Sequence, residues 1–81
     1  MKIDIIGKNS NQKNKLINNL YKSIKQMNLS VHPKIYEYSV DEYKNYHVQS
    51  TPALVIEDLL ISEGEVLSEQ EITKFIELYI N

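Results

Sequence analysis

The chain has 81 residues, 42% of them hydrophobic, which is enough for one small domain and not for two. It contains no cysteine, so disulfide bonds, thiolate nucleophiles and thiol-based electron transfer are excluded. No apolar run approaches the length of about 18 residues that a membrane span needs. We therefore expect a single domain over residues 1–81, with a cytoplasmic location because the N-terminus lacks the layout of a signal peptide.

Charge is divided unevenly along the chain, whose formal net charge is −2. Residues 1–34 carry seven Lys against one acid, Asp4, a balance of +6. Residues 35–81 carry two Lys against ten acids, a balance of −8. The chain has no Arg, which nucleic-acid sites normally use, so we predict no nucleic-acid partner. Solvated helix faces explain the asymmetry, and a basic surface for an anionic partner is the alternative.

The first third of the chain predicts a strand followed by a helix. The β-branched run over residues 2–6 ends at a glycine and predicts the strand. Ser10 is the expected N-cap of the helix, with Asn9 or Asn11 as alternatives, and Asn28 suits its C-terminal end. The apolar residues of the helix recur at helical spacing and are Leu16, Ile17, Leu20, Tyr21, Ile24 and Met27.

The middle of the chain predicts three further strands and a short helix. Residues 31–39 read as a strand, in which Pro33 indicates the edge of a sheet. A short helix is predicted over 41–47, because two acids suit its first turn. The apolar runs 53–57 and 59–62 predict an antiparallel hairpin that turns at Glu-Asp.

The last helix is predicted to begin at a capping box formed by Ser68 and Glu71. Its expected buried stripe, at helical spacing, is Ile72, Phe75, Ile76, Tyr79 and Ile80. The element order βαβ(α)ββα predicts an α/β fold, with a parallel first pair of strands and an antiparallel hairpin. A four-stranded mixed sheet flanked by helices is the economical arrangement at this length.

With this order, the segment Ser-Thr-Pro-Ala-Leu-Val-Ile at residues 50–56 resembles the cis-proline corner of the thioredoxin fold. Nearly the whole chain resembles the small thioredoxin-like proteins called redox-active disulfide proteins, and residues 48–65 match best. The resemblance implies a thioredoxin-like fold with a cis bond between Thr51 and Pro52. It also implies that the residue before the proline faces a ligand groove.

In that family, two cysteines separated by two residues open the first helix. The matching positions here are Ser10 and Lys13. A serine hydroxyl without a neighbouring base does not replace a thiolate, and lysine cannot resolve a mixed disulfide. The disulfide-reductase activity of the family is therefore not expected, and we predict neither an enzyme nor a cofactor.

The candidate binding residues are Ser10, Lys13, Thr51 and Pro52. At the N-terminus of a helix, free N–H groups and the helix dipole favour an anion, and the Lys13 ammonium would add positive charge. The predicted ligand is a small anion or a peptide carboxylate that also contacts the backbone of Thr51. The alternative is a serine that only caps the helix, a solvated lysine and a proline corner kept for folding.

Other candidate residues are fewer. His32 and His47, without cysteine, do not form a metal-binding constellation, so no metal site is predicted. His47 stands where relatives tend to have Gly, so we expect a positive φ there and a ring in solvent. Tyr21 and Tyr79 are expected in the core. The other tyrosines, expected as half-buried core or as an aromatic binding patch, are Tyr36, Tyr38, Tyr43 and Tyr46.

The sequence thus predicts a redox-inactive thioredoxin-fold domain that binds a protein, a peptide or a small anion, with no membrane partner. Two alternatives stay open. The first is a homo-oligomeric scaffold that pairs through the edge strand at residues 33–39. The second is a non-redox enzyme in which Ser10 or His47 is catalytic, although no base with an orienting partner is evident.

Overall fold

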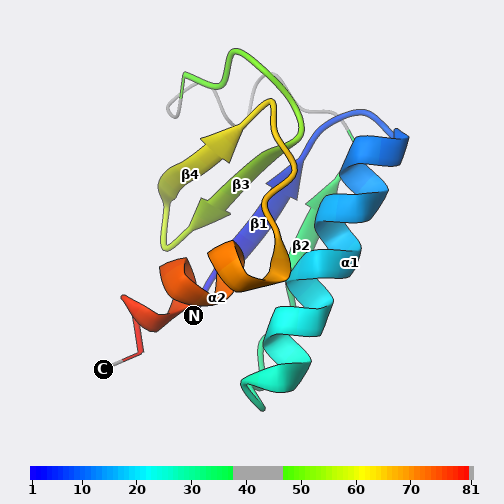
Figure 1. Cartoon of the computed structure of the whole chain (residues 1–81). Coiled ribbons are helices and arrows are strands. Elements are labelled where there is room, and N and C mark those ends of the chain that lie inside the picture. The colour runs from blue at the N-terminus through cyan, green and yellow to red at the C-terminus, as the bar shows by residue number, and fades with distance from the viewer. Residues whose placement is uncertain (38–46, 81) are drawn as a thin grey trace.

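The computed structural model of the chain describes residues 1–37 and 47–80 (Figure 1). The elements, in chain order, are β1 (Ile3–Ile6), α1 (Asn11–Gln26), β2 (Lys34–Tyr36), β3 (Ala53–Ile56), β4 (Leu59–Glu63) and α2 (Glu69–Glu77). The prediction of a helix over 41–47 falls outside the described residues except at His47, and so do the predictions for Tyr38, Tyr43 and Tyr46.

The four strands form one mixed sheet in the order β2-β1-β3-β4. β1 runs parallel to β2 and antiparallel to β3, and β3 and β4 form an antiparallel hairpin. Helices α1 and α2 lie side by side over one face of this sheet (Figure 1). The α/β class and the mixed sheet predicted from the sequence are confirmed, and β2 lies at an edge as predicted. The strand predicted over 31–39 is shorter within the described residues, because β2 begins at Lys34 and Pro33 precedes it.

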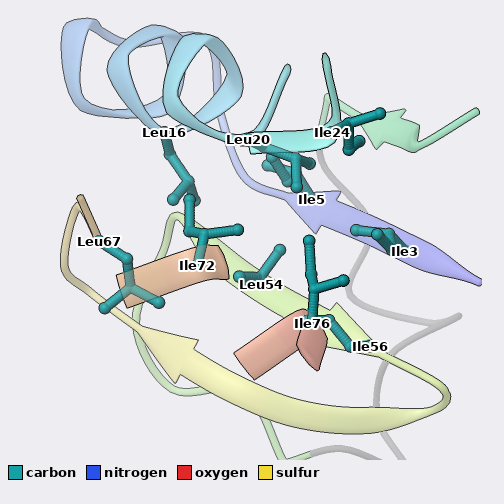
Figure 2. Packing of buried hydrophobic residues seen from close by; sticks show 10 residues of the cluster. All are labelled: Ile3, Ile5, Leu16, Leu20, Ile24, Leu54, Ile56, Leu67, Ile72 and Ile76. Atoms are coloured by element: carbon teal, nitrogen blue, oxygen red, sulfur yellow. The ribbon is translucent and has the colours of Figure 1, made fainter. Parts of the chain in front are cut away.

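The main core lies between the two helices and the sheet (Figure 2). Its buried residues are Ile3, Ile5, Leu16, Leu20, Ile24, Leu54, Ile56, Leu67, Ile72 and Ile76. A second cluster of Ile6, Ala53 and Val55 occupies the other face of the central strands, to which alternate residues point. Every residue of β1 and β3 is buried, which explains why both strands are almost continuously apolar.

Two residues predicted for the core are exposed instead. Tyr21 keeps 48% of its surface in solvent, because it lies at the margin of the α1 stripe centred on Leu16 and Leu20. Ile80 keeps 44%, because α2 ends at Glu77 and the helical spacing no longer aligns it with the buried stripe.

The local signals at the turns and helix ends are confirmed. Ser10 caps α1, and Asn28 beyond its end has a left-handed φ of 56°. His47 has the expected positive φ, at 53°. The β3–β4 turn has positive φ at both Glu57 (51°) and Asp58 (66°), the pattern of a type I′ hairpin turn.

The capping box at the start of α2 joins Ser68 and Glu71 in both directions. Glu71 N donates to Ser68 Oγ at 3.1 Å, and Ser68 N donates to Glu71 Oε1 at 3.0 Å. The hydrogen bond from the Ser68 backbone, followed by the one with its side chain, lowers the pKa of Glu71 below its ordinary value. The charged carboxylate is therefore the form that the folded state prefers.

Replacing Ser68 by Ala should reduce the free energy of unfolding by about 1 kcal/mol, because the N-cap bond to Glu71 is lost. Because the folded-state pKa of Glu71 is lowered, its stabilisation is present above the unfolded-state pKa and disappears as the pH falls through the folded value. Glu71→Gln should therefore lose stability at neutral pH and less in acid. Denaturant melts at several pH values measure both effects, and an unchanged midpoint for Ser68→Ala would contradict the cap assignment.

Candidate functional site

The corner before β3 is built around Pro52. The Thr51–Pro52 peptide bond is cis, Pro52 is buried, and Thr51 is exposed. Gly7, at the end of β1, lies directly against this corner. A Cβ atom on Gly7 would come within 3.0 Å of Thr51 Cβ and 3.3 Å of Pro52 Cα, so only glycine allows this approach. The loop after β1 is thus fixed against the residue pair before β3.

The far end of β4 holds the same corner from the other side. The Glu63 carboxylate accepts hydrogen bonds from Gln49 N at 2.8 Å and Ser50 N at 3.0 Å. Gly64 N donates to Pro52 O at 3.0 Å. Glu63 was not among the residues predicted for the site. The signal was its place beside Gly64 at the end of a strand, where its carboxylate can reach the backbone of a neighbouring loop.

Between these two supports lies Thr51, an exposed residue. Within residues 1–37 and 47–80, neither its N–H nor its C=O takes part in a hydrogen bond. The neighbouring groups are committed, since Ser50 N binds Glu63 and Pro52 O binds Gly64. Thr51 is therefore an exposed residue whose backbone donor and acceptor are not used within the described residues, on a segment held from both sides.

Lys13 occupies the first turn of α1, and its side chain is buried, with only 1% of its surface exposed. Its ammonium Nζ donates to Tyr36 O at 3.0 Å and to Asn9 Oδ1 at 3.3 Å. The same Tyr36 carbonyl also accepts from Gly7 N at 3.1 Å. The expectation of a solvated lysine is wrong, because the carbonyl at the end of β2 draws the ammonium inward.

Ser10 is the partly exposed N-cap of α1, and its Oγ accepts from Lys13 N at 3.1 Å. Gly7 brings the loop before α1 close to Thr51 and Pro52. Across the described part of the chain, no hydrogen bond joins Ser10 or Lys13 to that proline corner. Gly7 lies against Thr51 and Pro52, and it precedes Ser10 and Lys13 in the chain. A common binding role for Ser10, Lys13, Thr51 and Pro52 stays a prediction.

The histidines do not gather at this site. Both His32 and His47 are exposed, and the described ranges hold no group of three His, Asp or Glu side chains placed to bind a metal ion. In the same ranges, no helix is long and apolar enough to cross a membrane.

Gly7, Pro52 and all four strands lie in the part of the chain that matches a known protein family. The family model of the thioredoxin domain matches residues 1–77. The chain belongs to the thioredoxin domain family. No curated protein and no solved structure matches it. The resemblance seen in the sequence is confirmed over nearly the whole domain, and this thioredoxin domain contains no cysteine.

The buried position of Lys13 can be tested against a lysine two residues further along α1. Lys13→Ala should reduce the free energy of unfolding by about 2 kcal/mol or more, because it empties a filled site and removes two hydrogen bonds. Lys15→Ala, at an exposed position, should change it by no more than about 0.5 kcal/mol. Equal denaturant midpoints for the two variants would show that Lys13 is not part of the core.

Proposed function

We propose that this thioredoxin domain is a redox-inactive binding module that holds an extended protein or peptide segment at Thr51. The observation that supports the proposal is that Thr51 is exposed and its backbone makes no hydrogen bond within the described residues, while its neighbours Ser50 and Pro52 are held. In thioredoxin-like proteins that hold peptides or glutathione, the residue before this proline offers its backbone to the ligand. A peptide in extended conformation can pair with one N–H and one C=O in the manner of an added strand.

A peptide fits this site better than a small anion does. A small anion would need an accessible positive charge, and the Lys13 ammonium is buried against Tyr36 O and Asn9 Oδ1. Ser10 Oγ is already engaged with Lys13 N. A peptide depends on neither group, because backbone pairing at Thr51 supplies the hydrogen bonds and neighbouring side chains supply the selectivity.

The proposal includes no catalysis. Thioredoxin-type chemistry begins with a thiolate, and the chain has no cysteine. Ser10, at the first of the two cysteine positions, acts as a helix cap. His47 is exposed and is not joined to Ser10 by any hydrogen bond that the described residues make. A domain that retains the corner without the thiols is suited to hold a partner without reducing it.

The match between Ser10, Lys13 and the cysteine positions of the family can be tested by restoring the thiols. The unmodified protein should show no activity in an insulin-reduction assay. The double variant Ser10→Cys, Lys13→Cys should form an intramolecular disulfide under mild oxidant, detected by mass and by loss of free thiol. It should also be less stable than the parent when reduced, because the buried ammonium is gone. A double variant that keeps both thiols free would show that the loop is misaligned with that of the family.

Binding at the corner can be tested with S-methylglutathione, a small peptide that carries no free thiol. In a titration followed by amide chemical shifts, the largest changes are expected at residues 50–52 and 7–10. The exchange of the Thr51 amide proton with solvent should slow, since that N–H becomes hydrogen-bonded.

Thr51→Val is the matched control, because it removes the hydroxyl and keeps the backbone and the shape of the side chain. It should bind S-methylglutathione within about twofold of the parent, a difference of a few tenths of a kcal/mol. A large loss in this variant would assign binding to the hydroxyl. Shifts confined to other parts of the domain would contradict the corner as the binding site.

A further inference from the structure

The solvent-facing side of α1 is rich in lysine and lacks acidic residues, and packing of the core does not explain this composition. The helix contains no Asp or Glu, and its exposed residues are amides, three lysines and one tyrosine. We call Lys15, Lys22, Lys25 and Tyr21 the α1 basic face. These four residues are exposed, and the apolar stripe of the helix points the other way, into the core (Figure 2).

The three lysines of the α1 basic face have no acidic partner among the described residues. Among the described residues, an ion pair joins Lys2 to Asp58 of the β3–β4 turn, and it includes none of these three lysines. Exposed helices usually mix acids with lysines, because pairs three or four residues apart attract each other. On α1, Lys22 and Lys25 are three residues apart and repel, so the face costs the helix some stability and produces an unbalanced positive field.

The spacing of these residues gives the surface a definite shape. Lys15 and Lys22 are seven residues apart, or two helical turns, about 10 Å along the axis. Tyr21 is 48% exposed and lies four residues before Lys25, a spacing that places the two side chains on the same side of the helix. Tyrosine of this kind is favoured in protein interfaces, because its ring packs while its hydroxyl stays hydrated.

We propose that the α1 basic face binds an acidic segment of a partner protein. The three lysines would meet its carboxylates, the amides between them would bind its polar groups, and Tyr21 would pack against its side chains or backbone. This surface is formed by the side of α1 that points away from the sheet, so it does not depend on the Thr51 corner. Its failure in a test would leave the proposal for that corner unaffected.

Two other anionic partners fit the surface less well. A nucleic acid is favoured by Arg and by several exposed aromatic residues, and the chain has no Arg. A long polyanion would also approach the neighbouring acidic helix α2, with its exposed Glu71 and Glu77, in a protein of net charge −2. A membrane-binding helix inserts its apolar stripe into lipid, and that of α1 is buried in the core.

The test uses a short synthetic peptide rich in Glu, with a Gln-for-Glu peptide of the same length as its neutral counterpart. At low salt, the acidic peptide should shift the amide signals of residues 15–25 and the ring signals of Tyr21, and the neutral peptide should not. The triple variant Lys15→Gln, Lys22→Gln, Lys25→Gln should lose about tenfold in affinity, since each exposed pair contributes a small part of the binding. Lys74→Gln, an exposed lysine on α2, is the matched control and should bind like the parent.

Two outcomes would contradict the proposal and one would support it. Equal binding by the triple variant and the parent, with both shown to be folded by circular dichroism, would overturn it. Tighter binding of a single-stranded oligonucleotide or of anionic vesicles than of the acidic peptide would also overturn the choice of partner. Loss of peptide binding with rising salt, together with an unaltered S-methylglutathione titration in the triple variant, would support it.

Discussion

One carbonyl group joins β2, the loop after β1 and the start of α1 at one end of this domain. Tyr36 O, at the end of the edge strand β2, receives the N–H of Gly7 from the loop after β1 and the ammonium of Lys13 from the first turn of α1. Three elements therefore meet at one acceptor. The resemblance to redox-active disulfide proteins implies a cysteine at the position of Lys13 in that family. Here a buried cation fixes the start of the helix to the sheet, and it does so whatever the redox state of the surroundings.

The corner at Pro52 depends on this arrangement, because Gly7 belongs to both. Its backbone N–H binds Tyr36 O, and its missing side chain leaves room for Thr51 and Pro52. On the opposite side, Glu63 takes up the amides of Gln49 and Ser50. If the corner binds a peptide as proposed, a segment held in advance in this way would lose little conformational freedom on binding. This arrangement of the corner occurs in a domain that has no cysteine.

The fold could be predicted from the sequence because the features that indicate its helices and turns involve residues close together in the chain. The capping box of Ser68 and Glu71, the helical spacing of the α1 stripe and the turn after Ile56 each depend on residues a few positions apart. The burial of Lys13 could not be predicted, because it depends on a carbonyl 23 residues away whose position only the folded sheet defines. A lysine among polar residues at the start of a helix otherwise predicts a solvated side chain.

The same distinction holds for the site. The motif around Pro52 pointed to the corner, since a resemblance in sequence preserves local backbone shape. The Glu63 carboxylate binds Gln49 and Ser50, which precede it by 14 and 13 positions in the chain. No short sequence pattern predicts a contact over that distance. Tyr21 was misassigned for a related reason, because periodicity gives the direction of a helical stripe but not its width.

The pairing of β3 with β4 has a consequence for how the domain behaves in a crowded cell. Its register shifts between Leu54 and Val55, so that Ile61 is an extra residue in β4, an outer strand of the sheet. A bulge of this kind bends the strand and interrupts the regular row of outward N–H and C=O groups. Another chain then finds no flat template on which to add a strand, although Leu59 there is 57% exposed. The irregularity thus makes the β4 edge a poor template for edge-to-edge pairing with another chain.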